Sequence, residues 1–254
     1  MNIKKILLIL TLLLTQALFS ASSEQIEQYL TLSNADEELL ELESQFSQMQ
    51  NRFLNSKADT SEEKKMYDIQ MLTIRFKEYL AKNLSENEMD DVLQSYKNVI
   101  FLQFISATSI EKKNNNEEIK AYVKTFENNA SSSVRLSTVE KINEKFNNKE
   151  SITLHYDKLI KPLMQAAPGG EKLDNKYIEK SREAYVKSTL KKTKEFTLFA
   201  TKEFTQEELD KLLKIAQTPA IEHEIRAVYG AMAFALKDFF LTLASGYDIS
   251  KHQR

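Results

Sequence analysis

The chain has 254 residues, with 35 lysines and arginines against 37 aspartates and glutamates, and it has no cysteine. A weakly acidic chain lacks the basic surface expected of a nucleic-acid-binding protein, and a chain without cysteine forms no disulfide, cysteine nucleophile or cysteine-ligated metal site. Its 4 glycines and 3 prolines are too few for the turns of an all-β fold or the strand-to-helix crossings of a parallel α/β fold. The composition therefore predicts an all-α helical bundle.

The first residues have the layout of a secretory signal. Lys4 and Lys5 precede an apolar run at 6–14, and small residues at 20–22 offer a cleavage site. The run of nine residues is shorter than the about 20 that a membrane-spanning helix needs, which makes an uncleaved anchor the weaker alternative. We expect residues 1–21 to be a cleaved signal peptide and the rest to work in the periplasm of a Gram-negative bacterium, without a stable transmembrane anchor.

Apolar residues recur at helical spacing through most of the remaining chain. Helices are expected, in chain order, at 23–32, 35–55, 60–83, 85–111, 117–128, 138–146, 150–167, 174–202, 205–217 and 219–244. Several of these begin with a capping box, in which a serine or threonine and a glutamate three residues later satisfy each other's backbone N–H groups. The boxes are Thr60 with Glu63, Ser85 with Glu88, and Thr205 with Glu208.

Two of the helix junctions match each other along the chain. Residues 76–105 and 196–225 align without a gap at a constant offset of 120, and both carry a capping box flanked by an apolar staple pair. The match predicts a duplicated bundle of two similar helical halves, repeat 1 at 22–130 and repeat 2 at 134–247, separated at the serines 131–133. Two unrelated helical hairpins that use the same capping signals are the alternative.

A family resemblance follows from three features of the sequence: the signal, the opening segment Ile26–Ala35, and the late segment Phe204–Ala220. The late segment reads F-T-Q-E-E-L and then Thr218-Pro219. Together they resemble bacterial exported proteins carrying domain of unknown function 2059, in which F-[ST]-x-x-E-L precedes a short helix and a Ser-Pro or Thr-Pro break. Here Ala220-Ile221-Glu222 replaces the glycine, glutamine and lysine that usually follow. The resemblance implies a helical exported domain and supplies no catalytic residues.

Few residues have the spacing of a catalytic or metal site. His223 and Glu224 match the first half of the H-E-x-x-H zinc motif, but Ala227 stands where the second histidine is required. Paired carboxylates occur near the proposed helix starts, where the helix dipole accounts for them. We therefore predict no catalytic residue, no metal and no cofactor. A hydrolase that uses scattered carboxylates is the enzyme alternative.

The last helix, 219–244, is apolar on more than one face. Such a helix is normally central in a core, and the alternative is a groove or patch that holds a partner helix, an unfolded client or an acyl chain. Phe234, Phe239 and Phe240 are the candidate residues for facing a ligand or partner. The expected function is that of a non-catalytic binding or accessory protein of the envelope. Two hypotheses compete with it: a carrier that clasps a hydrophobic ligand between the two halves, and a homodimer formed through the last helix.

Overall fold

The computed structural model describes residues 20–56, 67–111, 116–126, 133–166, 170 and 173–245. Every regular element within these ranges is a helix, which confirms the predicted all-α class. The expected signal sequence up to residue 19, the capping box at Thr60 and Glu63, and the predicted boundary at Ser131 and Ser132 lie outside the described residues. None of the described helices is long and apolar enough to cross a membrane.

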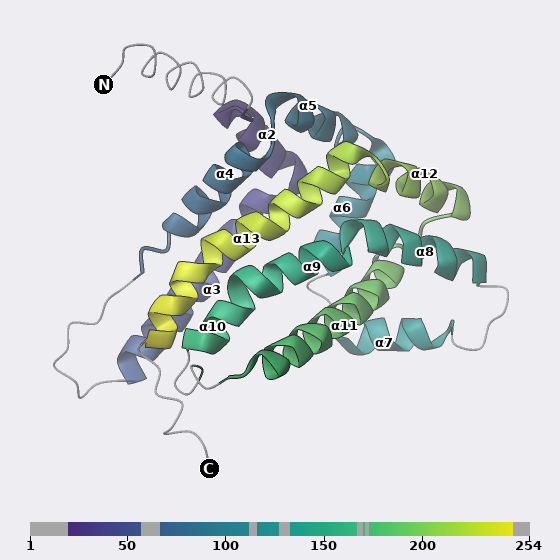
Figure 1. The fold of residues 1–254 in the computed structure, drawn as a ribbon. Coiled ribbons are helices and arrows are strands. Elements are labelled where there is room, and N and C mark those ends of the chain that lie inside the picture. The colour runs from purple at the N-terminus through teal and green to yellow at the C-terminus, as the bar shows by residue number, and fades with distance from the viewer. Residues whose placement is uncertain are drawn as a thin grey trace, which may run out of the picture.

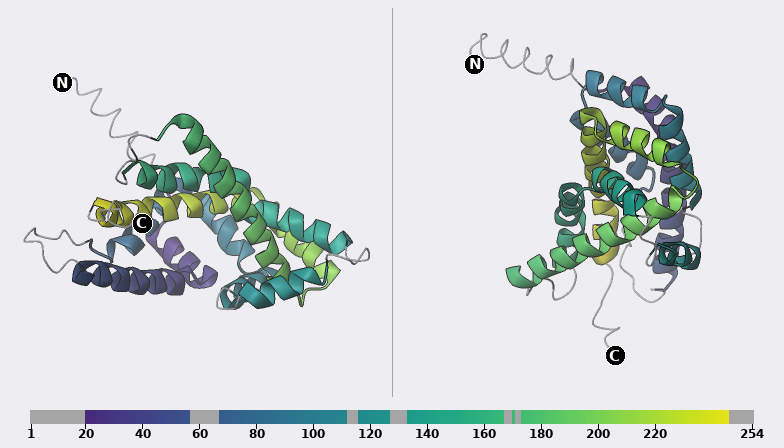
Figure 2. Two further views of the ribbon diagram at one scale, coloured as in Figure 1. Left: turned by 90° about the horizontal axis from the view of Figure 1, so that it is seen from below. Right: turned by 90° about the vertical axis from the view of Figure 1, so that its right-hand side faces the viewer.

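The bundle is built around its last helix. The helices are α2 (Ser23–Ser33), α3 (Ala35–Ser56), α4 (Met71–Asn83), α5 (Glu86–Ser95), α6 (Val99–Glu111), α7 (Asn116–Lys124), α8 (Ser133–Phe146), α9 (Lys149–His155), the π-helical segment η2 (Tyr156–Ile160), α10 (Lys161–Ala166), α11 (Asn175–Ala200), α12 (Gln206–Ala216) and α13 (Pro219–Ser245). Helix α13 crosses the middle of the molecule, and it packs on α4 and α5 from one side and on α9, η2 and α10 from the other (Figure 1). Figure 2 shows the same arrangement from below and from the side. The last helix is therefore a central core helix.

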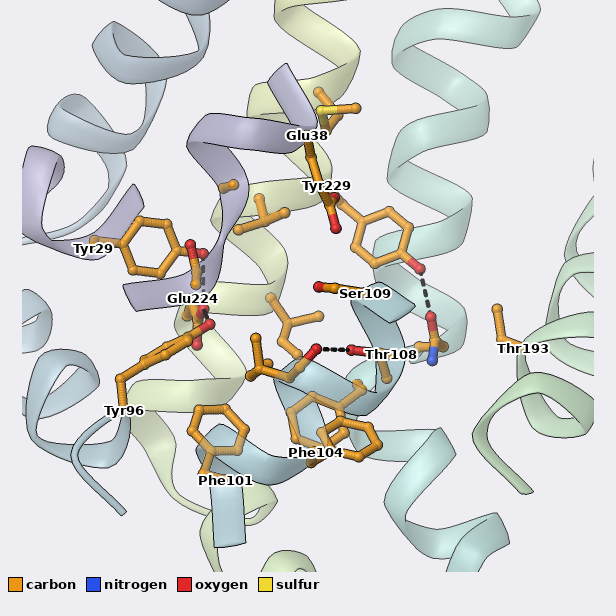
Figure 3. A pocket seen from close by; sticks show the side chains of 18 of the residues that line it. Tyr29, Glu38, Tyr96, Phe101, Phe104, Thr108, Ser109, Thr193, Glu224 and Tyr229 are labelled. Atoms are coloured by element: carbon orange, nitrogen blue, oxygen red, sulfur yellow. Dashed lines mark hydrogen bonds between the residues drawn. The ribbon is translucent and has the colours of Figure 1, made fainter. Parts of the chain in front are cut away.

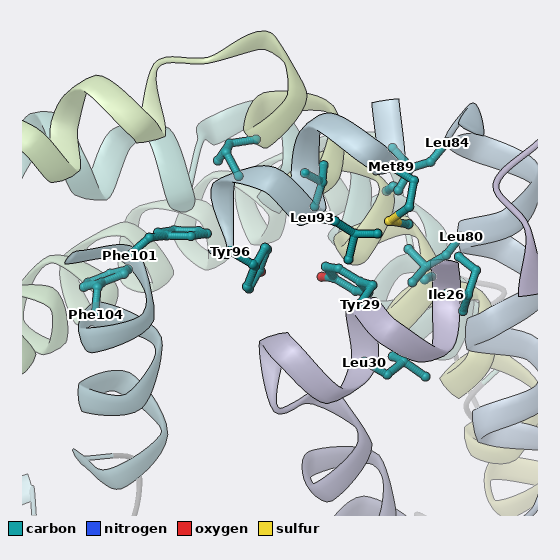
Figure 4. Close-up of a cluster of buried hydrophobic side chains, with 14 of the residues drawn as sticks. Ile26, Tyr29, Leu30, Leu80, Leu84, Met89, Leu93, Tyr96, Phe101 and Phe104 are labelled. Atoms are coloured by element: carbon teal, nitrogen blue, oxygen red, sulfur yellow. The ribbon is translucent and has the colours of Figure 1, made fainter. Parts of the chain in front are cut away.

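The two predicted halves share one hydrophobic core. The main cluster joins Leu80 and Met89 from the first half to Leu209 and Ile221 from the second. Figure 4 shows the part of this cluster formed by α2, α4, α5 and α6. Ala21, at the end of the expected signal, belongs to the cluster as well, and its backbone N–H donates to the carbonyl oxygen of Leu84 at 2.9 Å. Since α12 packs on α8 and α6, and α13 packs on α4, the halves interleave.

Local capping signals set several of the helix starts. The boxes at Ser85 and Thr205 both form, with each hydroxyl accepting from the backbone N–H of Glu88 or Glu208 and each glutamate accepting in return. Their apolar staple residues are all buried: Leu84, Met89, Phe204 and Leu209. These contacts occur between residues at most five positions apart, which is why the sequence alone could predict them.

The largest differences from the expected helix bounds concern three helices. In the described part of the helix expected at 60–83, residues 67–70 precede the helix and Met71 begins it, because the Asp68 side chain accepts from the Gln70 N–H and forms a turn there. The helix expected at 85–111 is interrupted after Ser95, and the Asn98 side chain caps the next helix by accepting from the Ile100 N–H. The helix expected at 138–146 begins five residues earlier, at Ser133.

The helix expected at 150–167 contains a π-helical segment. Pro162 has no N–H to donate to the carbonyl of Lys158, and its ring would clash with that carbonyl in a regular α-helix. The chain responds by widening the preceding turn, and the Lys161 N–H donates to the carbonyl of Tyr156, five residues back. The side chain of Tyr156 is fully buried at this point, and its hydroxyl donates to the carbonyl of Ile178 on α11 at 3.2 Å.

A glycine of α13, Gly230, faces the side chain of Tyr79 on α4. A Cβ placed on Gly230 would lie 2.4 Å from the hydroxyl oxygen and 2.6 Å from a ring carbon of Tyr79 on α4. The Tyr79 ring therefore occupies the space that any larger residue at position 230 would need. This contact explains a glycine in the middle of a 27-residue helix, where alanine would otherwise be the more stable choice.

Candidate functional site

A cavity of about 410 Å³ is enclosed by α13, by helices of the N-terminal part of the chain and by residues of α8 and α11. Its walls are mainly apolar and aromatic. The aromatic lining residues are Tyr29, Phe76, Tyr96, Phe101, Phe104, Phe146, Phe196 and Tyr229. Several of these rings pack on one another: Tyr96 and Phe101 have ring centroids 4.7 Å apart, and Phe104 and Phe146 are stacked at 5.0 Å. The packing holds the wall residues in place and leaves the space between them open.

Glu224 supplies a buried carboxyl group to this cavity. Its side chain projects from α13, and the residue is only 4% exposed. The Tyr29 hydroxyl on α2 donates to Oε1 at 2.8 Å, and the Tyr96 hydroxyl at the end of α5 donates to the same oxygen at 2.5 Å. No hydrogen bond from the described residues reaches Oε2, the other oxygen of the group. Figure 3 shows the carboxyl group between the two phenol rings.

Burial controls the protonation of this group. Removal from water disfavours the charged form and raises the pKa of Glu224 to about 7, although the hydrogen bonds from Tyr96 and Tyr29 oppose this shift. Burial and the adjacent Glu224 raise the pKa values of both tyrosines well above their usual value, so both phenols remain protonated donors. Near neutral pH the carboxyl group therefore exists in both protonation states, held in one position by two neutral donors.

Helical spacing explains why Glu224 points inward. Ile221, Ala227 and Ala231 are buried on the same face of α13, three or seven residues from Glu224. His223, the preceding residue in the chain, projects to the outside, where its Nδ1 lies 2.5 Å from Glu88 Oε1. The pair that resembled half of a zinc motif is thus divided between the surface and the interior. The described residues contain no group of three or more histidine, aspartate or glutamate side chains placed to hold a metal ion.

The cavity adjoins a wider, more polar hollow of about 1000 Å³ beside α3 and α6. The two spaces share the side chains of Glu38, Leu42, Ile105, Ser109 and Met232. Glu37 and Glu41, one turn apart on α3, line the outer hollow. We treat this outer hollow as the mouth of the cavity.

The three phenylalanines predicted to face a ligand lie elsewhere. Phe239 is fully buried and stacks on Phe46 of α3 with ring centroids 4.6 Å apart, and half-buried Phe240 contacts the same ring at 5.4 Å. Phe234 is 43% exposed and packs against Tyr79. None of the three lines the cavity. Phe239 and Phe240 belong to a second, smaller core cluster near the C-terminal end of α13.

Other residues of the same helix do line the cavity. They are Glu224, Ile225, Val228, Tyr229 and Met232. Sequence reasoning did not select Glu224 as a site residue, although a signal existed: a glutamate occurs at an inward position of an otherwise apolar helical stripe that includes Ile221, Val228 and Ala231. Its partners Tyr29 and Tyr96 lie 195 and 128 residues away in the chain, and no local pattern pairs them.

Searches against protein-family models, curated proteins and solved structures found no match to this chain. The resemblance to domain of unknown function 2059 therefore stays a prediction. The features of the chain that bear on its function are the cavity and Glu224.

Proposed function

We propose that this protein is a non-catalytic binding protein of the bacterial envelope that holds a small hydrophobic ligand in the Glu224 cavity. The observation that carries the proposal is the cavity itself. Its volume of about 410 Å³ lies within the range of about 300–1,000 Å³ typical of small-molecule sites, which are mostly apolar with a few placed polar groups. Aromatic walls and one desolvated carboxyl group fit this description.

A hydrolytic role has less support from the same geometry. General acid–base catalysis requires a positioned acid or base, usually together with a nucleophile, a second carboxyl group or a metal-bound water. The hydrogen-bond partners of Glu224 are two tyrosines, whose raised pKa values make them poor proton donors to a reacting group. The arrangement is suited to recognising a polar group on an otherwise apolar ligand.

The remaining proposals concern origin and location. The described helix starts support an ancient duplication, because α5 and α12 begin at residues 86 and 206 and α6 and α13 begin at residues 99 and 219, each pair 120 residues apart. The first copy breaks at Asn98 without the proline that stands at 219 in the second. Export to the periplasm is supported by the N-terminal layout of the sequence.

The test is a titration with the fluorescent apolar probe N-phenyl-1-naphthylamine. Ser109→Trp places a large side chain at the junction of cavity and mouth, whereas Gln103→Trp places the same side chain on an exposed position of the same helix, α6. We expect the probe to bind saturably to the wild type and to Gln103→Trp. Ser109→Trp should bind the probe about tenfold more weakly, which corresponds to a loss of about 1.4 kcal/mol of binding free energy. Absence of saturable binding to the wild type, or equal binding by both variants, would contradict the proposal.

A further inference from the structure

The charged side chains that line the cavity and its mouth all have the same sign. They are Glu38 and Glu224 in the cavity, with Glu37 and Glu41 added in the mouth. No lysine, arginine or histidine lines either space among the described residues, although the chain as a whole carries nearly balanced charge. A low-dielectric hollow lined by one sign of charge attracts ligands of the opposite sign.

The deepest of these carboxyl groups has an unused acceptor. Both tyrosine hydroxyls contact Oε1 of Glu224, while Oε2 accepts nothing from the described residues. A carboxylate has room for about four hydrogen bonds, and a buried carboxylate without a cationic partner is costly. A ligand that donated from a positive group to Oε2 would supply the missing partner, and charge-assisted hydrogen bonds of this kind are stronger than neutral ones.

The aromatic walls favour the same class of ligand. The rings of Tyr29 and Tyr96 flank the carboxyl group, and Phe101 packs edge-on against Tyr96. Aromatic faces attract ammonium groups through their negative quadrupole, most strongly where water is excluded. Beyond the carboxyl group, Phe104, Val228 and Met232 offer only apolar surface to the rest of a ligand. A carboxylate or phosphate head group would instead face Glu224 inside and Glu37 and Glu41 at the mouth.

We propose that the ligand is a hydrophobic amine, bound with its ammonium group on Glu224 Oε2 and its apolar tail along the phenylalanine-lined wall. The inference rests on the proposed function, since it names the ligand class of the same cavity. Glu37 and Glu41 at the mouth attract the cation, and Glu224 with its two tyrosines selects the head group. A neutral or anionic amphiphile of the same length lacks the cation that these groups recognise.

Binding is expected to depend on pH. An ammonium group binds the charged form of Glu224, whose pKa burial raises to about 7, while an alkylamine stays protonated well above that pH. The groups facing the carboxyl group are Tyr29 from α2 and Tyr96 from α5, both neutral in this range, with Glu38 of α3 lining the same cavity. Because the charged fraction of Glu224 rises about tenfold between pH 6 and pH 8, affinity for the amine should rise by about the same factor.

The experiment is isothermal titration calorimetry on the purified full-length chain with decylamine, decanol and decanoate below their micelle concentrations. We expect decylamine to bind about tenfold more tightly than decanol, as one charge-assisted hydrogen bond allows, and decanoate to bind most weakly. Glu224→Gln keeps an oxygen for the two tyrosines but removes the charge, and it should abolish both the preference for decylamine and its rise with pH. Glu222→Gln, which removes an exposed charge from the same helix, should change neither.

The outcomes separate the two proposals. If none of the three amphiphiles binds, the proposed function fails and the inference fails with it. If decanol or decanoate binds as tightly as decylamine, or if Glu224→Gln keeps the preference, the amine inference is overturned while the binding function stands. The pH profile of the wild type needs no variant, so a flat profile from pH 6 to pH 8 overturns the inference even if Glu224→Gln does not fold.

Discussion

Replacing Glu224 by glutamine should change how stability depends on pH. The folded pKa of about 7 lies above the ordinary value of 4.5, so between these values the folded chain holds a proton that the unfolded chain has released. The contribution of Glu224 to the unfolding free energy is therefore fully present below pH 4.5 and is lost as the pH rises through 7. A shift of about 2.5 pKa units corresponds to about 3 kcal/mol of unfolding free energy. Because Glu224 is only 4% exposed, solvent screens this effect little.

Glutamine is neutral at every pH and avoids this loss. The unfolding free energy of Glu224→Gln minus that of the wild type should therefore increase by about 3 kcal/mol between pH 4.5 and pH 8.5. Because the variant and the wild type share all other titratable groups, the effects of those groups on the unfolding free energy cancel in this difference. The assay is urea unfolding followed by far-ultraviolet circular dichroism in ligand-free protein at several pH values, with Glu222→Gln as the exposed control. A difference that does not change with pH would refute the assigned burial and protonation of Glu224.

Two further predictions concern other contacts of α13. Phe239→Ala should lower the unfolding free energy by about 3–5 kcal/mol, because it opens a cavity beside Phe46. Phe234→Ala, at a 43% exposed position, should lower it by less than about 1 kcal/mol. Equal losses for the two variants in urea unfolding would contradict these placements. Gly230→Ala should destabilise by about 1–3 kcal/mol because its Cβ overlaps Tyr79. In a Tyr79→Ala background the same change should be neutral or stabilising by up to about 1 kcal/mol, and persistence of the cost there would exclude the overlap as its cause.

Much of the fold was accessible from the sequence because helix formation is local. The all-α class follows from sparse glycine and proline, and the starts at Glu86 and Gln206 follow from capping boxes whose partners are three residues apart. The errors were also local in origin. At three positions a local interaction competes with an apolar helical pattern that continues before and after it. These are the turn at Asp68, the cap at Asn98 and the π-helical turn before Pro162.

The candidate site was not accessible in this way. Apolar periodicity marked α13 as important but could not distinguish Phe239, which fills the core, from Val228 and Met232, which line a cavity. That distinction depends on which helices cover each part of α13. Glu224 gains its raised pKa only when α2 and α5 bring Tyr29 and Tyr96 over it and remove it from water. Helix ends depend on interactions within one turn, whereas cavities and buried charges depend on packing between segments that are distant in sequence.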